Sequence, residues 1–249
     1  MSHIARLYVD VPLQEGAEIA LPEAQSKYLV RVMRMASGAT VRAFNGRDGE
    51  WQCSLQVQGK SAALIPHAQT RAQVAVPDLT LIFAPIKKTR TDFIIEKATE
   101  LGVRTICPVV TEYTQTHRVR TDRMRALAIE AAEQTERMDL PNICDVESLP
   151  SVLDRWDQSI PLIYCDEGSD AAPISQYRER LSDSPAALLI GPEGGFSPKE
   201  RKMLRELAYV LPITLGPRIL RAETAVVSAL TLWQSQVGDW QKAPYLPQT

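Results

Sequence analysis

The pattern of apolar and polar residues changes once along this chain, near residue 72. Before that point, short segments alternate apolar and polar residues, and alternation with a period of two predicts half-buried strands. Four such segments are clear, at residues 6–11, 39–45, 50–57 and 61–67. The first part of the chain is therefore expected to be a small all-β domain.

Two further features complete this first domain. The sequence NGRDG at residues 45–49 joins two predicted strands, and Asn and Gly accept the backbone angles of a tight hairpin turn. A helix is predicted from about Pro22 to Met35, with its buried side formed by Leu29, Val30, Val32 and Met33. A small β-barrel with one helix agrees with this order of elements.

Apolar strands and amphipathic helices alternate after residue 78. The predicted strands are 79–85, 105–110, 160–166, 186–192 and 209–216, and the predicted helices are 92–101, 122–135, 197–207 and 221–237. This alternation indicates an α/β domain with a mostly parallel sheet covered on both faces. Residues 70–78 resemble a linker, so the predicted domains are 1–72 and 73–249.

A glycine-rich turn lies between a strand and a helix at residues 188–200, LLIGPEGGFSPKE. The helix start is well marked, with Ser197 as N-cap, Pro198 at the first position and Glu200 as the capping-box carboxylate. Glycines in the turn leave backbone groups open to a ligand. The carboxylate of Glu193 disfavours a polyphosphate, so we expect an uncharged or partly cationic ligand.

A second strand-to-helix turn, LGPRILRAETA at residues 215–225, carries Arg218, Arg221 and Glu223 on an otherwise apolar segment. These charges could simply cap the helix at the surface. Ligands of parallel sheets bind outside the carboxyl ends of the strands. We therefore expect the loops at 191–195 and 216–220 to meet around one site.

Composition narrows the possible partners. A net charge of −2 and a pI near 6.0 provide no overall basic field, so nucleic-acid binding would need a local patch. The four cysteines and three histidines are scattered without a CxxC pair, which argues against a metal site or disulfide framework. The N-terminus lacks a signal-peptide pattern, and no apolar run approaches the roughly 20 residues that span a bilayer. A cytoplasmic protein without membrane attachment is expected.

Local basic patches are present nevertheless. Arg31 and Arg34 are three residues apart on the predicted first helix, with Lys27 one turn earlier, so the three share a face. Lys87, Lys88 and Arg90 form a basic loop before the next helix. Spacing alone leaves open whether these side chains contact RNA or only water. Glu133 and Arg137 are at i,i+4 spacing, which by itself favours an ordinary surface ion pair.

Four motifs occur in order behind the β domain: KATELGV, EAAEQTER, IGPEGGFSPKE and LGPRILRAETA. With them the chain resembles, over nearly its whole length, the bacterial 16S ribosomal RNA uridine-N3 methyltransferases of the SPOUT superfamily. The resemblance implies a PUA-like RNA-binding domain followed by a methyltransferase domain with a C-terminal trefoil knot. It also implies S-adenosylmethionine as cofactor, and 16S ribosomal RNA, within the small ribosomal subunit, as partner.

The resemblance assigns roles to residues of both turns. Methylation at uridine N3 requires removal of an imide proton, so Glu223 is a candidate general base and Arg221 and Arg218 are candidates for stabilising charge. The expected cofactor-binding residues are Ile190, Gly191, Glu193, Gly194, Gly195, Leu215, Gly216, Ile219, Leu220 and Thr224. The expected RNA-binding residues are Arg6, Lys27, Arg31, Arg34, Lys87, Lys88 and Arg137. The alternatives are a non-catalytic RNA-binding or ribosome-assembly factor, and a methyltransferase acting on another RNA.

The predicted last helix suggests self-association. An apolar stripe at helical spacing contains Val226, Val227, Leu230, Trp233 and Val237. Burial against the chain's own sheet would also explain this stripe. The resemblance implies a homodimer with the cofactor near the interface.

Overall fold

A computed structural model describes residues 4–116, 119–166, 168, 170–182 and 185–243. The chain divides into two compact units, one containing Met1–Ala75 and Ala132–Leu140, the other Val76–Ala131 and Pro141–Ala243. The break lies close to the residue at which the hydrophobic pattern changes. The segment Ala132–Leu140, placed by the sequence in the second domain, belongs instead to the first unit.

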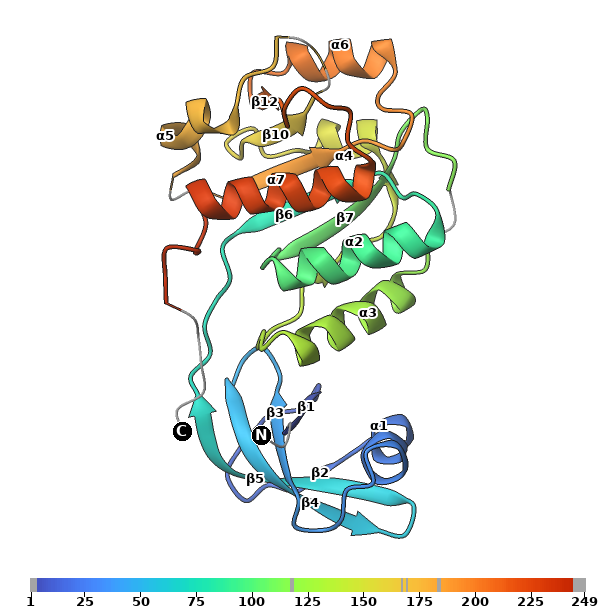
Figure 1. The fold of residues 1–249 in the computed structure, drawn as a ribbon, viewed down its shortest axis with the longest axis vertical. Helices are drawn as coiled ribbons and strands as arrows, with labels where there is room; N and C mark the ends of the chain where they lie inside the picture. Colours follow the sequence, from blue (N-terminus) through green and yellow to red (C-terminus); the bar gives the residue numbers. More distant parts are fainter. Residues whose placement is uncertain (1–3, 117–118, 167, 169, 183–184, 244–249) are drawn as a thin grey trace. The chain divides into compact units, whose positions relative to one another are not determined.

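The first unit is built on a five-stranded sheet of order β1-β3-β4-β5-β2 (Figure 1). Its strands are β1 (Ala5–Tyr8), β2 (Ile19–Ala20), β3 (Thr40–Phe44), β4 (Glu50–Gln58) and β5 (Ser61–Arg71). The four predicted strands and the hairpin at residues 45–49 are confirmed. The structure adds the short β2 and a parallel pairing of β1 with β3. Closure of this sheet into a barrel remains a prediction.

The helix of the first unit is shorter than expected. It consists of α1 (Glu23–Lys27) and a turn of π-helix, η1 (Tyr28–Val32). Leu29 is buried as predicted, but Val32 is 64% exposed and Met33 is 39% exposed, so their predicted burial is wrong. The wider π turn changes the direction of the side chains that follow it, and α-helical spacing no longer applies.

The second unit contains a parallel sheet of order β12-β10-β11-β6-β7-β8, with β9 also paired to β7. Its strands are β6 (Leu79–Phe83), β7 (Thr105–Val110), β8 (Asn142–Ile143), β9 (Glu147–Ser148), β10 (Leu162–Cys165), β11 (Ala186–Ile190) and β12 (Val210–Ile213). All the predicted strands are confirmed, and every pairing of the named strands is parallel. All five residues of β11 are buried, as expected for a central strand covered on both faces.

Helices cover both faces of this sheet. They are α2 (Lys88–Glu100), α3 (Thr121–Gln134), α4 (Leu149–Asp154), η2 (Ile174–Tyr177), α5 (Arg178–Leu181), α6 (Pro198–Glu206) and α7 (Ala222–Gln236). Helices α2 and α7 lie side by side over one face (Figure 1). Apolar residues of α4 and α6 pack in a separate cluster with the opposite side chains of the strands. The four predicted helices are confirmed.

The apolar stripe of α7 is used largely within the chain. Val226, Leu230 and Trp233 are buried in the core with α2 and the sheet, at 0%, 0% and 3% exposure. The stripe therefore does not indicate a dimer interface, because its central residues are already covered. Within the part of the chain that the structure describes, the helices are all too short or too polar to cross a bilayer.

Candidate functional site

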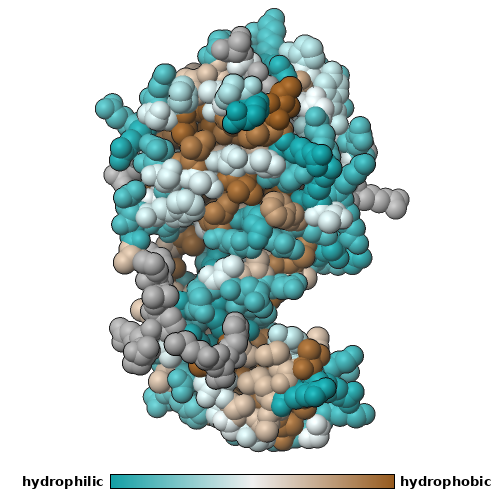
Figure 2. Space-filling model, in the orientation of Figure 1, coloured by the Kyte–Doolittle hydropathy of each residue, from teal (hydrophilic) through white to brown (hydrophobic). Residues whose placement is uncertain are grey.

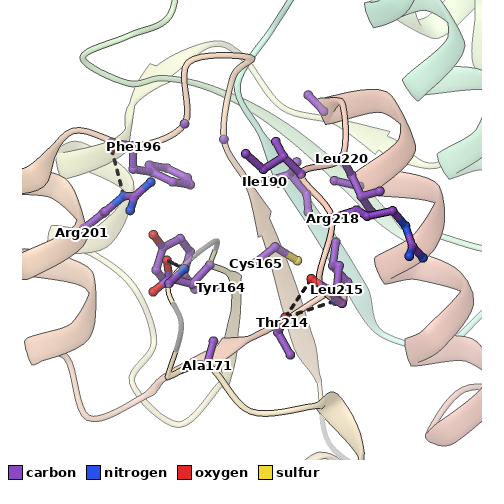
Figure 3. A pocket seen from close by; sticks show the side chains of 18 of the residues that line it. Tyr164, Cys165, Ala171, Ile190, Phe196, Arg201, Thr214, Leu215, Arg218 and Leu220 are labelled. Carbon is purple, nitrogen blue, oxygen red and sulfur yellow. Dashed lines mark hydrogen bonds between the residues drawn. The ribbon is translucent and has the colours of Figure 1, made fainter.

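A cavity of about 450 Å³ lies at the carboxyl ends of β10, β11 and β12 (Figure 3). Three segments line it: the loop after β11, the loop between β12 and α7, and the end of β10 with the residues that follow. The two loops expected to meet do so. The sheet order explains this, because β10 lies between β11 and β12 and all three strands run in parallel.

The loop after β11 is held firmly at its end. Ser197 Oγ accepts from the amide of Glu200 at 3.2 Å, and Glu200 Oε2 accepts from the amide of Ser197 at 2.9 Å, so the predicted capping box is present. Glu200 Oε1 also accepts from the amide of Glu112 at 2.9 Å. The buried carboxylate thereby joins the start of α6 to the loop after β7.

Two glycines of this loop are required by its geometry. Gly195 has φ +67°, a conformation that β-branched residues strongly disfavour. A Cβ on Gly191 would lie 2.8 Å from the Phe196 ring. Each additional side chain would therefore displace part of the cavity wall.

The loop after β12 forms the opposite wall. The amide of Gly216, whose φ is +101°, donates to Thr214 Oγ1 at 3.1 Å and closes a tight turn. Leu215 and Leu220 supply apolar surface facing Ile190 (Figure 3). Ile219 also lines the cavity but is 85% exposed.

The third wall was missed by the sequence interpretation. Tyr164 lies against Phe196 in an edge-to-face contact, with ring centroids 5.2 Å apart. Asp166 is buried and accepts from Arg205 Nη2 at 2.6 Å and from the amide of Gly168 at 3.0 Å. Burial and, secondarily, the Asp166 charge raise the pKa of the Tyr164 hydroxyl. An aspartate directly after an apolar strand was the available signal, since strand ends in parallel sheets carry ligands.

Charged side chains gather beside this cavity around Arg90 of α2. Arg90 Nη1 lies 3.5 Å from Glu193 Oε1, and Arg90 Nε lies 3.4 Å from Glu223 Oε1. The other oxygen of Glu223, Oε2, is buried and accepts no hydrogen bond from any residue that the structure describes. A buried acceptor left free beside a cavity can take a proton or hydrogen bond from a ligand.

Comparisons with known proteins agree with this geometry. Residues 74–234 match the RNA methyltransferase domain family, and residues 21–65 match the RNA methyltransferase PUA domain family. A ribosomal RNA small subunit methyltransferase E from Rickettsia conorii is 31% identical over 90% of this chain and 93% of its own length. The chain belongs to this methyltransferase family.

Solved structures of relatives contain a cofactor. Ribosomal RNA small subunit methyltransferase E from Neisseria gonorrhoeae, bound to S-adenosylmethionine, is 28% identical, with a TM-score of 0.86 over 96% of this chain and all of the other. A methyltransferase from Legionella pneumophila with the same cofactor is 28% identical, with a TM-score of 0.87 over 95% of this chain and 99% of the other.

In the chain described here, eight of the ten residues expected to bind the cofactor line the cavity. They are Ile190, Gly191, Glu193, Gly195, Leu215, Gly216, Ile219 and Leu220. Gly194 and Thr224 do not line it. Gly194 lies against Tyr113, since a Cβ there would be 3.5 Å from the Tyr113 Cβ, and Thr224 is exposed on α7.

The three candidate catalytic residues occupy different positions. Glu223 does not line the cavity, but it shares Arg90 with Glu193, which does. Arg218 lines the cavity, although its guanidinium points away from it in Figure 3. Arg221 is exposed at the N-cap of α7. Arg90, which the sequence interpretation left among basic loop residues, contacts Glu223 directly because α2 and α7 are neighbours.

Arg6 was predicted to bind RNA, and the structure contradicts this prediction. Its side chain is 2% exposed, and its Nε donates to Glu50 Oε2 at 2.8 Å. Its terminal nitrogens donate to the carbonyls of Ala132, at 2.7 Å, and Arg137, at 3.1 Å. The guanidinium holds the segment 132–140 to the sheet of the first unit and is inaccessible to a phosphate.

Arg137 is also corrected. Helix α3 ends at Gln134, so Glu133 and Arg137 do not lie on one α-helix. Arg137 is buried and donates from Nε to Asp139 Oδ1 at 2.9 Å, whereas Glu133 Oε1 accepts from the amide of Tyr8 at 3.0 Å. A direct RNA contact from Arg137 is therefore not supported.

The remaining candidates for RNA binding are exposed. Lys27, Arg31 and Arg34 are exposed on the first unit, and Lys87 and Lys88 on the second. Arg34 has φ +55° and follows the π turn, so the expected helical face shared with Arg31 is wrong.

Proposed function

We propose that this chain transfers a methyl group from S-adenosylmethionine to N3 of a specific uridine in 16S ribosomal RNA of the small ribosomal subunit. The observation that carries the proposal is the glycine-lined cavity at the ends of β10, β11 and β12, in a chain that belongs to a ribosomal RNA methyltransferase family. When bound, S-adenosylmethionine supplies an electrophilic methyl group on a sulfonium.

The residues present are suitable for this cofactor. A volume of about 450 Å³ lies within the usual range of small-molecule sites. Ile190, Leu215 and Leu220 provide apolar contacts, and the carboxylates of Glu193 and Asp166 suit the cationic sulfonium or amino group. The cofactor carries no phosphate, so these carboxylates do not oppose its binding.

The chemistry of the acceptor assigns the charged residues. Uridine N3 carries an imide proton, and Glu223 Oε2, with its free acceptor capacity, takes that proton in our proposal. Arg90 holds the Glu223 carboxylate in place, while Arg218 and Arg221 stabilise negative charge on the base or its phosphate. N3 lies on the Watson–Crick edge, so the target base must be unpaired or flipped to react.

In this proposal, exposed cations on each unit contact RNA. Lys27, Arg31 and Arg34 contact phosphates from the first unit, and Lys87 and Lys88 from the second. Arg6 and Arg137 support the fold of the first unit instead.

We also propose that the chain forms a homodimer and that its methyltransferase domain contains a trefoil knot, as the sequence resemblance implies. Apolar surface is visible on the second unit in Figure 2, and Ile219, Leu232 and Trp240 are exposed. These residues, and not the buried stripe of α7, support the dimer. Sedimentation equilibrium at micromolar concentration tests the dimer, because a mass remaining at 27.7 kDa would exclude it.

An experimental structure in which the C-terminal segment does not pass through a loop would exclude the knot.

Nucleoside mass spectrometry of ribosomal RNA tests the activity. Cells lacking the gene should lose one methylated uridine of 16S RNA, and the purified protein with S-adenosylmethionine should restore it. Titration calorimetry should show binding of S-adenosylmethionine and none of ATP or GTP. Retention of every methylated uridine in the deletion strain would contradict the proposal.

A further inference from the structure

Two of the four cysteines, which the sequence shows as isolated, lie together at the sheet of the second unit. Cys107 is in β7, and Cys144 directly follows β8. These strands pair in parallel with Ile106 opposite Ile143, and the Cys144 amide donates to the Ile106 carbonyl at 2.9 Å. Cys107 and Cys144 directly follow this pair on the two chain segments, and both line one cavity.

The pair opens into a second cavity, separate from the proposed cofactor site. This cavity has a volume of about 230 Å³, and its lining includes Trp156, Glu147 and Arg155. Both cysteines are half-buried, so small reagents in water can reach them. Neither residue has a role in the proposed methyl transfer.

The surroundings shift the pKa values of the two thiols in opposite directions. The neighbouring Cys107 thiol lowers the pKa of Cys144 to about 7, against the opposing effects of burial and of Glu147 and Asp145, with help from Arg155. The Cys144 thiol, together with burial, raises the pKa of Cys107. The lowered pKa favours the thiolate, the nucleophilic form, on Cys144, and the raised pKa keeps the proton on Cys107.

We propose that Cys107 and Cys144 form a redox-active dithiol that hydroperoxides convert to an intramolecular disulfide and that thiol reductants convert back. The Cys144 thiolate attacks one oxygen of hydrogen peroxide, breaks the O–O bond and becomes a sulfenic acid, releasing hydroxide. The Cys107 sulfur then attacks the Cys144 sulfur, and the hydroxyl group leaves with the Cys107 proton as water. The sulfur atoms lose two electrons in total and the peroxide gains them.

The backbone geometry permits this bond. Neighbouring strands are separated by about 4.7–4.9 Å, and disulfides join Cα atoms about 4.4–6.8 Å apart. Cys144 lies just beyond the two-residue strand β8, and its amide bond to the Ile106 carbonyl keeps it beside β7.

The other two cysteines serve as internal controls. Burial raises the pKa of Cys53 and of Cys165 to about 12, so both are protonated at neutral pH. Cys53 is in β4 of the first unit, and Cys165 lines the proposed cofactor cavity. We expect neither to react at peroxide concentrations that oxidise Cys144.

Intact-protein mass spectrometry of the full chain after mild hydrogen peroxide tests the proposal. The expected product has lost two hydrogen atoms, yields one peptide pair cross-linked through Cys107 and Cys144, and returns to the original mass with dithiothreitol. A chain that keeps four alkylatable thiols, or that forms a disulfide through Cys53 or Cys165, would overturn it.

Variants separate the two steps. Cys107→Ser should accumulate a sulfenic acid on Cys144 that dimedone traps, because the resolving thiol is missing. Cys53→Ser should form the disulfide as the unchanged protein does. Dimedone labelling of Cys107 in Cys144→Ser, at the rate seen for Cys144, would contradict the assigned order of attack. The unchanged protein provides the disulfide test without any variant, so a folding defect cannot obscure it.

Discussion

Each unit contains a cluster in which arginine meets glutamate, and the two clusters differ in what they leave free. In the first unit, Glu50 is 0% exposed and accepts from Arg6 at 2.8 Å and from Arg71 Nε and Nη2 at 3.1 and 2.5 Å. In the second unit, Arg90 reaches Glu193 and Glu223 only at 3.5 and 3.4 Å. Short hydrogen bonds hold the first cluster together, and we call it the closed cluster. The arginine–glutamate distances in the second are longer, and we call it the open cluster.

The charges of the first cluster stabilise the fold, whereas those of the second are placed for chemistry. Burial acts to raise the pKa of Glu50, but hydrogen bonds from Arg71 and Arg6 outweigh it, and the pKa is lowered. Its acceptor capacity is used within the fold. Glu223 instead keeps one buried oxygen free of partners among the described residues, next to the cavity. Changes to the first cluster should therefore affect stability, and changes to the second should affect activity.

The largest expected effect is on the closed cluster. Glu50→Gln should lower the stability of the first unit by about 3 kcal/mol, at the low end of the range for a broken buried ion pair, because the two buried guanidinium groups keep only the partly exposed Glu136 as counter-charge. Faster hydrogen exchange of the β4 amides, with β6 unchanged, would show this. Glu18→Gln, at an exposed position of the same unit, is the matched control and should have no effect.

The pH dependence of this unit should follow the same carboxylate. A pKa lowered in the folded state means that Glu50 contributes stability above the pKa of the unfolded chain. That contribution is lost as the pH falls through the lowered, folded pKa. Denaturant unfolding at decreasing pH should show this loss in the unchanged protein, and a Glu50→Gln variant with the same pH profile would contradict the assignment.

The next largest effect is on the open cluster. Glu223→Gln should reduce kcat about 100-fold, at the low end of the range for general bases, with stability and S-adenosylmethionine affinity retained. Glu193→Gln removes a contact to the same Arg90 but leaves Glu223 in place, so it controls for loss of the ion pair. Equal losses of kcat in the two variants at saturating cofactor would argue against Glu223 as the base.

A smaller effect is expected from the glycine loop. Gly195→Val should weaken S-adenosylmethionine binding about 10-fold or more, because a β-branched residue at φ +67° forces the loop to move. Gly16→Val imposes a similar strain at φ +74° where the added Cβ meets nothing within 4 Å. Calorimetry should show normal cofactor affinity for Gly16→Val and reduced affinity for Gly195→Val.

The smallest effect concerns exposed charge on the first unit. Arg31→Ala with Arg34→Ala should weaken RNA binding and reduce the slope of affinity against salt by about one unit for each phosphate group that is no longer neutralised. Cofactor affinity should not change. Salt titrations that coincide with those of the unchanged protein would place both arginines in solvent, without an RNA contact.

Local sequence was sufficient for the features that depend on neighbouring residues. The capping box of Ser197 and Glu200, the glycine turn before it and the predicted strands of both units were confirmed, because these follow from spacing, turn chemistry and strand periodicity. The meeting of the loops at 191–195 and 216–220 was also predictable, since parallel strands bring their carboxyl ends to one edge.

Only the tertiary structure determined which charged and sulfur-bearing residues are free to react. Arg6 and Arg31 are both arginines near predicted elements, yet one is buried against Glu50 and the other is exposed. Arg90 of α2 meets Glu223 of α7, far along the chain, and Cys107 meets Cys144 through strand pairing. The burial, hydrogen-bond partners and pKa of a side chain depend on neighbours that packing brings together over such separations. Spacing along the chain does not predict those neighbours.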